Sequence, residues 1–273
     1  MELTLKTRSL KYNYDKKIVL ENVDIEIIKG ETIGILGPNG CGKTTLLKNL
    51  NKNLTPAEGC VLLDDMDMNE MPKKDIAKKI AVVPQTNEIR FAFTVRDIVT
   101  MGRFPFQGLM SGESDEDLKI VDNAIEKTGL SDLADRHINT MSGGERQRVI
   151  IARALAQTPS ILLMDEPTLH LDISTQFDVL DLVSRLSKEE NMTVVIVSHD
   201  LPMVVRYCDR IMMLKDHKIF AIGTPEEVLT PENMRAVFNV DAVLEKDERT
   251  GRNAVRLFGS CTNLVDAEGD DTE

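Results

Sequence analysis

The sequence is poor in aromatic residues and in basic ones. Tryptophan is absent from the 273 residues, and the aromatic residues together make up 4%. Stacking on aromatic side chains is therefore not expected to be the main basis of binding. The 33 lysines and arginines are outnumbered by 45 aspartates and glutamates, which gives a net charge of −12. Because nucleic-acid binding requires a basic face, this balance argues against a nucleic-acid partner.

Long apolar runs are absent as well. None approaches the roughly 20 residues of a membrane-spanning helix, and the stretch 1–6 lacks the apolar segment of a secretory signal. Cysteine is scarce, and the scattered Cys41, Cys60, Cys208 and Cys261 share no metal-ligand spacing, which indicates reduced cytoplasmic thiols. With 42% hydrophobic residues the chain can still bury a sizeable core, as one large domain or two small ones. We therefore expect a soluble cytoplasmic protein, which could still dock on a membrane protein.

The clearest motif is a glycine-rich loop that follows a short apolar run, Ile33–Leu36. It reads G-x-x-x-x-G-K-T and continues into a stretch with apolar residues at helical spacing, 44–50. Its glycines allow backbone N–H groups to converge on phosphates, and the helix adds free amides and the positive end of its dipole. Lys43 is expected to reach the β- and γ-phosphates, and the Thr44 hydroxyl to bind Mg²⁺. A plain glycine turn before a surface helix is disfavoured, because strand and helix both lie where the motif needs them. The loop comprises Gly37, Pro38, Asn39, Gly40, Cys41, Gly42, Lys43, Thr44 and Thr45.

Two carboxylates and a histidine end later apolar runs. One buried run ends in Asp165 and Glu166, and another ends in His199. In a protein with a phosphate loop, an aspartate in this place holds Mg²⁺ directly or through water, and Glu166 could accept a proton from the attacking water. His199 would share a sheet edge with Gly37 and Gln85, where contact with a terminal phosphate is expected.

The N-terminal segment alternates apolar and polar residues. Leu3–Lys11 and Ile18–Ile28 therefore read as strands, the second of them half-buried. The polar residues 12–17 between them predict a turn region that contains Tyr12 and Tyr14. An aromatic ring there could stack on an adenine ring or pack at a strand end, and the residues alone do not separate the two.

The stretch from 86 to 139 changes to polar and charged helices. Helices are predicted at 94–101, with Thr94 as N-cap, and at 114–128. The apolar side of the second helix carries Leu118, Val121 and Ile125. We expect a helical insertion between core strands.

Another helix opens with a serine and two glycines, Ser142, Gly143 and Gly144. The free amides at its start are a second place where backbone groups can meet an anion. Taken alone this is weak evidence, since a serine cap before a helix is ordinary. The two glycines would also let an anion come close to the backbone, which a plain helix cap does not require.

The C-terminal part alternates short elements. We predict a helix at 201–207, strands at 210–214 and 219–223, and helices at 224–229 and 231–238. A final hairpin is expected over 240–257. The residues 266–273 include five acids and no base, which predicts a disordered tail.

Together, these motifs resemble those of the ATP-binding subunit of ABC transporters, over residues 2–258. The resemblance is specific because six elements occur in the family's order. They are the Walker A loop at Gly37–Thr45, the Q-loop at Gln85, the signature motif at Met141–Glu145, Walker B at Ile161–Glu166, the D-loop at Leu169–Asp172 and the switch histidine His199. Glu145 departs from the family's commonest form, which has glutamine, and His170 stands where small or polar residues are usual. An acid at 145 weakens binding of a partner's phosphate unless its side chain points away.

The resemblance implies an α/β fold, in which a P-loop NTPase core sheet carries an N-terminal antiparallel β-subdomain and an inserted α-helical subdomain. Residues 1–258 would form the ABC ATPase domain, with the helical subdomain at about 86–157, and 259–273 an acidic disordered tail. Two copies would face each other head to tail, each ATP lying between two subunits. One subunit would contribute the loop 37–45, Gln85 and Tyr14, which matches the family's adenine-stacking aromatic, with Tyr12 as the competing choice. The other would contribute Ser142, Gly143, Gly144, Glu145 and Asp172.

The resemblance also implies roles and partners. Glu166 would deprotonate water, Lys43 and His199 would stabilise charge on the γ-phosphate, and Thr44, Gln85 and Asp165 would hold Mg²⁺. Hydrolysis would reopen the dimer, and segment 85–107 would pass that motion to membrane permease subunits. An extracytoplasmic solute-binding protein would be an indirect partner. The implied location is the cytoplasmic face of the cell membrane.

Three stretches resemble more narrowly the ATPases of iron-siderophore, haem and cobalamin importers: Val99–Pro105, Gly223–Leu229 and Phe238. An importer ATPase for another small solute and a soluble ABC ATPase outside transport are the alternatives. The soluble class usually carries two ATPase units or long coiled-coil insertions, and neither is visible in the sequence. A non-hydrolysing regulatory module is disfavoured by the presence of Glu166 and His199. The solute itself stays unnamed.

A separate hypothesis concerns Cys41. It lies in a helix-terminal loop that carries a lysine, a setting that lowers the pKa of a thiol. Alkylation of Cys41 would then inhibit the ATPase, and ATP would protect it.

Overall fold

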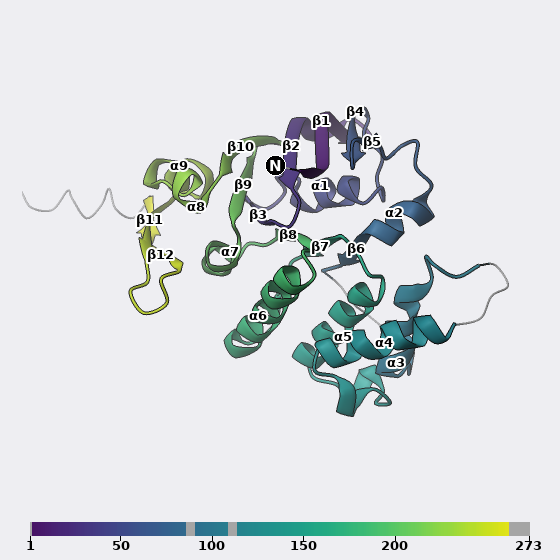
Figure 1. Ribbon diagram of the computed structural model, residues 1–273. Helices are drawn as coiled ribbons and strands as arrows, with labels where there is room; N and C mark the ends of the chain where they lie inside the picture. Colours follow the sequence, from purple (N-terminus) through teal and green to yellow (C-terminus); the bar gives the residue numbers. More distant parts are fainter. Residues whose placement is uncertain (1, 86–90, 109–113, 262–273) are drawn as a thin grey trace, which may run out of the picture.

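An antiparallel sheet forms the N-terminal part of the protein in the computed structural model, which describes residues 2–85, 91–108 and 114–261 (Figure 1). Its strands are β1 (Leu3–Tyr14), β2 (Lys17–Ile28), β4 (Glu58–Leu63) and β5 (Met66–Asp67), in the order β2-β1-β4-β5. The alternation in β1 and β2 places side chains such as Leu5 and Val23 in the core.

The polar turn predicted at 12–17 is wrong in extent. Strand β1 continues through Tyr14, and only Asp15 and Lys16 turn between β1 and β2. Tyr12 and Tyr14 pair with residues of β2 and extend the ladder, in keeping with the preference of aromatic side chains for strands. Asp15 takes the left-handed backbone conformation (φ 52°) that a two-residue hairpin turn requires.

The central sheet has six strands, ordered β10-β9-β3-β8-β7-β6. They are β3 (Thr32–Leu36), β6 (Ile80–Val83), β7 (Ile161–Asp165), β8 (Thr193–Val197), β9 (Arg210–Lys215) and β10 (Lys218–Gly223). All pairs are parallel except β9 with β10. Every residue of β3, β7 and β8 is buried, as expected for parallel strands covered on both faces. The carboxyl ends of the parallel strands consequently share one edge.

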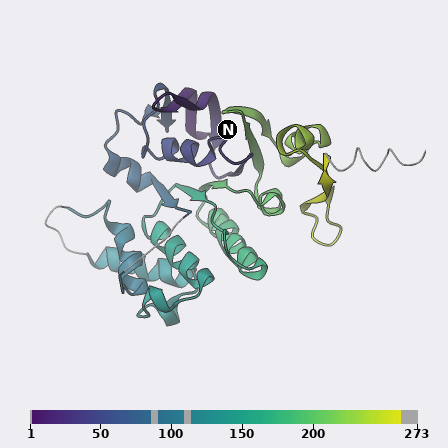
Figure 2. The same ribbon diagram turned by 180° about the vertical axis from the view of Figure 1, so that it is seen from behind.

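Successive residues of the central strands face opposite layers. Ile33 and Ile35 of β3 pack in one cluster with the antiparallel sheet and α1 (Lys43–Leu50). Leu162 and Met164 of β7 pack in a second cluster with the helical side of the molecule. This side includes α6 (Ile173–Glu189) and α7 (Leu201–Tyr207), which lie below the sheet in Figure 1 and are seen from behind in Figure 2.

The helical insertion lies between β6 and β7, as the sequence predicted. It follows α2 (Lys73–Lys79) and β6, and contains α3 (Val95–Thr100), α4 (Asp115–Lys127), α5 (Gly143–Ala156) and the 3₁₀ turns Met101–Arg103, Ser131–Leu133 and Ile138–Thr140. Thr94 caps α3 as predicted. Val121 and Ile125 of α4 are buried, whereas Leu118, placed on the same apolar side by the sequence, is 39% exposed.

The C-terminal elements are α8 (Pro225–Val228), α9 (Pro231–Phe238), β11 (Val240–Lys246) and β12 (Asn253–Ser260). The predicted hairpin is present. The boundary expected after residue 258 falls inside β12, and the Cys261 amide donates to the Asn239 carbonyl. The predicted acidic stretch 266–273 lies outside the described residues.

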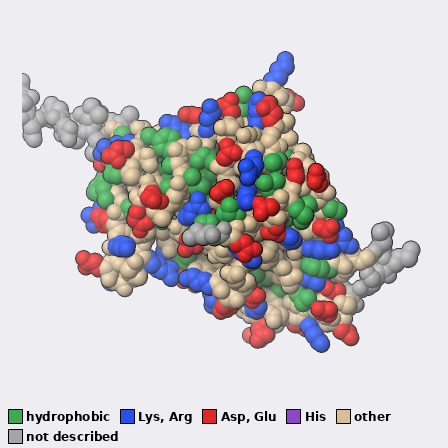
Figure 3. Space-filling view, turned by 45° about the horizontal axis from the view of Figure 1, so that its top comes forward, with side chains coloured by type: hydrophobic (Ala, Val, Ile, Leu, Met, Phe, Trp, Pro, Cys, Tyr) green, Lys and Arg blue, Asp and Glu red, His purple; other side chains and the backbone are tan. Residues whose placement is uncertain are grey.

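The surface mixes charges of both signs. Figure 3 shows acidic and basic side chains interspersed over the face that it presents. Among the residues that the structure describes, no helix has the length and apolar character needed to cross a bilayer.

Candidate nucleotide-binding site

The glycine-rich loop joins β3 to α1, as the motif requires. Gly42, which precedes α1, has φ 111°, and a β-carbon there would lie 2.6 Å from the Val19 carbonyl oxygen of β2. Only glycine fits this position. The Lys43 side chain is buried within the loop, and its Nζ donates to the carbonyl oxygens of Gly37 (2.7 Å) and Pro38 (3.2 Å). The ammonium group is thus held at the N-terminus of helix α1, beside the amides that could bind phosphate.

The predicted low thiol pKa of Cys41 is wrong. The side chain is 4% exposed and belongs to the core cluster under the loop. Burial raises the pKa of the Cys41 thiol, and the nearby charge of Lys43 only partly offsets this effect. The sequence placed Cys41 in the correct loop and did not show that its side chain turns inward.

A hydroxyl and a carboxylate meet where α1 passes the end of β7. Thr44 Oγ1 donates to Asp165 Oδ1 at 3.2 Å, so two of the three predicted magnesium ligands are in contact. Burial raises the pKa of Asp165, and the hydrogen bond from Thr44 opposes that shift. A divalent cation would stabilise this buried carboxylate in its ionised form.

The third predicted magnesium ligand, Gln85, is not bonded to this pair. It is exposed just after β6, at the same sheet edge, and no hydrogen bond joins it to Thr44 or Asp165. Within residues 2–85, 91–108 and 114–261, no group of three or more His, Cys, Asp and Glu residues is placed to hold a metal ion. The oxygen donors of Thr44, Asp165 and Gln85 fit Mg²⁺ only with phosphate and water oxygens completing the set.

Glu166 and His199 form the next pair along the same edge. Glu166 follows β7 with φ 50°, and its side chain is 11% exposed. Its Oε2 lies 2.7 Å from His199 Nδ1 and also accepts from the His199 amide at 3.3 Å. Asp200 caps α7 through the Met203 amide, which fixes the start of the helix directly after the histidine. The carboxylate and the imidazole predicted from sequence are therefore brought together.

The second predicted anion site opens α5. Ser142 Oγ accepts from the Glu145 amide (3.3 Å), while the Glu145 carboxylate accepts from the Ser142 amide (2.7 Å). This reciprocal pair is a capping box. The Glu145 side chain thus folds back on Ser142, and these hydrogen bonds hold the pKa of its carboxyl group below the usual value.

The start of α5 packs on the start of α6. A β-carbon at Gly144 would lie 2.3 Å from Thr175 Cγ2, so this glycine is needed for helix packing and not only for the approach of an anion. Asp172 caps α6 by accepting from the Thr175 amide (3.0 Å) and hydroxyl (2.7 Å). These bonds hold the pKa of the Asp172 carboxyl group low. His170 is exposed, with φ 64°.

Two functional groupings, therefore, exist in one chain. Among the residues that the structure describes, no hydrogen bond or ion pair joins Ser142–Glu145 to the loop 37–45. The loop, Thr44–Asp165 and Glu166–His199 share the carboxyl edge of the central sheet, and the Ser142 turn belongs to the helical insertion (Figure 1).

The two tyrosines differ in exposure. Tyr14 is 45% exposed, whereas Tyr12 is partly buried and packs against the N-terminal core. Their rings lie edge to face, with centroids 5.0 Å apart. Tyr14 is therefore the more exposed of the two rings.

Sequence reasoning missed two residues beside these groups. Thr175 donates its amide to Asp172, and its methyl group leaves no room for a β-carbon at position 144. The spacing Asp-x-x-Thr is typical of a helix N-terminal cap and could have indicated the contact with Asp172. Arg136 Nη1 lies 4.0 Å from Glu145 Oε1, and no local motif signals this contact.

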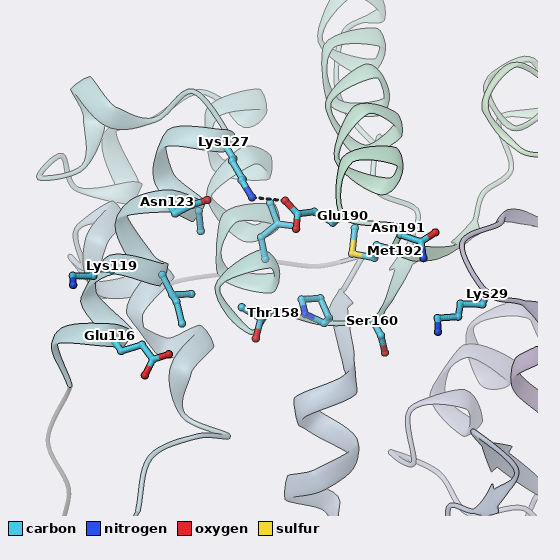
Figure 4. A pocket seen from close by; sticks show the side chains of 14 residues that line it. Lys29, Glu116, Lys119, Asn123, Lys127, Thr158, Ser160, Glu190, Asn191 and Met192 are labelled. Carbon is cyan, nitrogen blue, oxygen red and sulfur yellow. Dashed lines mark hydrogen bonds and ion pairs between the residues drawn. The ribbon is translucent and has the colours of Figure 1, made fainter. Parts of the chain in front are cut away.

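A large cavity lies away from these residues. It has a volume of about 630 Å³ and is lined by α4, the end of α5, and the turns before β3 and β8. Figure 4 shows the Lys127–Glu190 ion pair at its rim. Because β3 and β8 begin here, the cavity is at the edge of the sheet opposite the glycine-rich loop.

The chain resembles known proteins of one family in both sequence and fold. Residues 20–169 match the ABC transporter family. The chain is 41% identical over 249 residues to the iron(3+)-hydroxamate import ATP-binding protein FhuC of Bacillus subtilis (strain 168), covering 91% of this chain and 93% of that protein. It superposes on a metal-chelate type ABC transporter in an inward-facing conformation with a TM-score of 0.84, at 29% identity, covering 97% of this chain and 100% of that one. A dimeric ATP-binding cassette bound to ADP and phosphate matches with a TM-score of 0.68 at 32% identity, covering 81% of this chain and 98% of that one. The chain therefore belongs to the ABC transporter family, among its ATP-binding subunits.

Proposed function

We propose that this chain is the ATP-hydrolysing subunit of an ABC importer of the iron-siderophore, haem or cobalamin type. The observation that carries the proposal is the pairing of Thr44 with Asp165 and of Glu166 with His199 at one sheet edge, beside the lysine-bearing loop. The similarity to an iron(3+)-hydroxamate import protein along nearly the whole chain supports the importer class and this range of solutes.

In the proposed reaction the loop 37–45 binds the phosphates of ATP. Lys43 leaves the carbonyl groups of Gly37 and Pro38 and donates to the β- and γ-phosphates, together with the amides at the start of α1. Glu166 accepts a proton from the attacking water, and His199, held against it, stabilises charge on the γ-phosphate.

Mg²⁺ belongs to this site as a proposed cofactor. Thr44 and Asp165 would bind it, with Gln85 joining from the end of β6. When bound, the ion would neutralise charge on the β- and γ-phosphates. Tyr14 is proposed to stack on the adenine, because it is the more exposed of the two tyrosines.

The proposed site is completed by a second copy of the chain. The amide and hydroxyl groups of Ser142, Gly143 and Gly144 and the Asp172 turn would face the phosphates bound by the loop of the partner subunit. The separation of the two groupings within one chain supports this arrangement, as does similarity to a dimeric cassette bound to ADP and phosphate. A head-to-tail pair with closed two-fold symmetry contains two such sites.

The remaining partners are membrane proteins. Segment 85–107 begins at the end of β6 and includes Phe104, which is 60% exposed, so it is proposed to contact permease subunits. The subunit would then lie on the cytoplasmic face of the cell membrane, and a solute-binding protein would act on the other side. The ATPase domain is proposed to run from residue 1 through the end of β12, two residues beyond the boundary expected at 258, with the helical subdomain at about 86–157.

The decisive experiment is reconstitution with permease subunits of an iron-siderophore, haem or cobalamin importer. Liposomes carrying the complex should release phosphate from ATP faster when ferric siderophore, haem or cobalamin and the solute-binding protein are supplied. A complex containing the Glu166→Gln variant is the control for hydrolysis by this chain. Stimulation by none of these solutes would reject the importer class proposed here, and absence of phosphate release would reject the ATPase.

A further inference from the structure

The first turn of α5 carries two reciprocal hydrogen bonds that determine which of its donors are free. The Ser142 amide is taken by the Glu145 carboxylate, and the Glu145 amide is taken by Ser142 Oγ. The Arg146 amide donates to the Ser142 carbonyl as the helix begins. Three donors of this turn have no partner among the described residues: the amides of Gly143 and Gly144 and the hydroxyl proton of Ser142.

The capping box also leaves that hydroxyl proton available. A serine hydroxyl has one proton and two lone pairs. Because Ser142 Oγ acts as the acceptor for the Glu145 amide, the capping box does not use its proton, which is left to donate to an acceptor outside the helix. The carboxylate of Glu145 fixes the Ser142 backbone from the other side.

We propose that Glu145 is a positioning residue, which holds Ser142 so that its hydroxyl proton and the amides of Gly143 and Gly144 face the γ-phosphate of ATP bound by the partner subunit. This inference rests on the proposed dimer. It assigns a role to the residue at which this chain departs from the common form of the signature motif. Glu145 itself does not touch the nucleotide.

The carboxylate brings a second, opposing effect. Its negative charge lies in the first turn of a helix that receives an anion, and like charges repel. Arg136 Nη1, 4.0 Å from Glu145 Oε1, offsets part of this charge and is itself held by Thr140. In Glu145→Gln the side-chain carbonyl oxygen can still accept from the Ser142 amide, but the negative charge is gone. This variant therefore distinguishes the positioning of Ser142 from the repulsion of the phosphate.

A plain helix cap would use the same bonds, and the chain offers a matched control. Thr224 and Glu227 form a capping box at α8 with nearly the same lengths, 2.8 Å from the Thr224 amide to the Glu227 carboxylate and 3.3 Å from the Glu227 amide to Thr224 Oγ1. This box adjoins the end of β10, where Gly223 pairs with Ile211 at the start of β9. It is thus at the sheet edge opposite the glycine-rich loop.

The test measures ATP-driven dimerisation in the Glu166→Gln background, by sedimentation velocity across a range of ATP concentrations. We expect Glu145→Ala to raise the half-maximal ATP concentration roughly two- to tenfold, the range that one hydrogen bond contributes. Glu145→Gln should need no more ATP than the parent and should respond less to added salt. Glu227→Ala should leave the ATP requirement unchanged while lowering the melting temperature about as much as Glu145→Ala does.

In the hydrolysis-competent chain the same variants separate binding from chemistry. Glu145→Ala should raise KM for ATP by a similar factor, with kcat at saturating ATP within about twofold of the original. The inference is overturned if Glu145→Ala dimerises like the parent, if Glu145→Gln is as weak as Glu145→Ala, or if Glu227→Ala shifts the ATP requirement equally. Failure of the Glu166→Gln parent to dimerise with ATP would instead reject the dimer on which the inference rests.

Discussion

Substitution of Gly144 by alanine should damage the ATPase through a neighbouring helix and not through the nucleotide. The added β-carbon would lie 2.3 Å from Thr175 Cγ2, so the two helices must separate by roughly 1 Å to restore normal contact. Thr175 cannot turn aside easily, since a β-branched side chain has few rotamers and its hydroxyl donates to Asp172 at 2.7 Å. The strain therefore moves the start of α5, the start of α6 and the Asp172 turn together.

The loss of stability in Gly144→Ala is the difference between two opposing free-energy terms. Overpacking of this kind costs about 1–3 kcal/mol, and alanine gains back up to about 1 kcal/mol over glycine in a helix. The two terms leave a net loss of about 0–3 kcal/mol, which lowers the melting temperature by about 2–4 °C per kcal/mol in a chain of this size. A displacement of about 1 Å in a positioned group reduces turnover by about 10²-fold.

The assay is phosphate release at saturating ATP, combined with thermal unfolding of Gly144→Ala, Thr175→Ser and the double variant. Thr175→Ser keeps the hydroxyl that bonds Asp172 and removes the methyl group that would clash. It should be nearly neutral alone and should restore most of the activity lost in Gly144→Ala. Failure of the double variant to recover would refute the packing argument and leave anion approach as the reason for the glycine.

Three further outcomes are expected. Glu166→Gln should bind ATP with little change while phosphate release falls by roughly 10²- to 10⁴-fold, the usual contribution of a general base; undiminished turnover would remove Glu166 from that role. Cys41 should resist alkylation in the folded protein at neutral pH and react after unfolding, as mass spectrometry of labelled peptides can show, because burial raises its pKa; rapid native labelling would contradict the buried position. The Arg103 guanidinium and the Ser114 hydroxyl lower the pKa of Asp117, so this pair stabilises the fold above the ordinary carboxyl pKa of about 3.9 and is lost as pH falls below it. Asp117→Asn should lower the melting temperature at pH 7 and flatten its decline in acid, and an unchanged acid profile would count against this ion pair.

Much of the fold could be predicted because its signals are local. A fully apolar run such as Ile161–Met164 can only be a buried strand or a buried helix segment, and its length and following carboxylates indicate a strand end. Thr94 and Ser142 indicate the starts of α3 and α5, because threonine and serine are favoured at the N-cap position of a helix. Carboxyl ends of parallel strands share an edge, so the meeting of Asp165 with the glycine-rich loop also followed from sequence.

What could not be predicted depends on contacts between distant residues. The inward turn of Cys41 depends on the packing of the loop against the N-terminal core, and no pattern near the loop records it. The need for glycine at 144 depends on a threonine 31 positions later in the chain. The polar neighbours of Tyr12 and Tyr14 predict a turn, whereas pairing with β2 holds both residues in a strand.

The register of the central strands fixes the relative positions of the residues in the proposed nucleotide site. Val197 lies opposite Ile35 on one side and Asp165 on the other, so the glycine-rich loop, the carboxylates and the histidine all start from neighbouring points of one ladder. A slip of β7 by a single residue would displace Glu166 by about 3.3 Å and exchange the faces to which Asp165 and Met164 point. Since the other four residues of the strand, 161–164, are all apolar, such a slip would keep most of the buried apolar surface. An inserted residue in β7 is consequently expected to lower turnover more than it lowers the melting temperature.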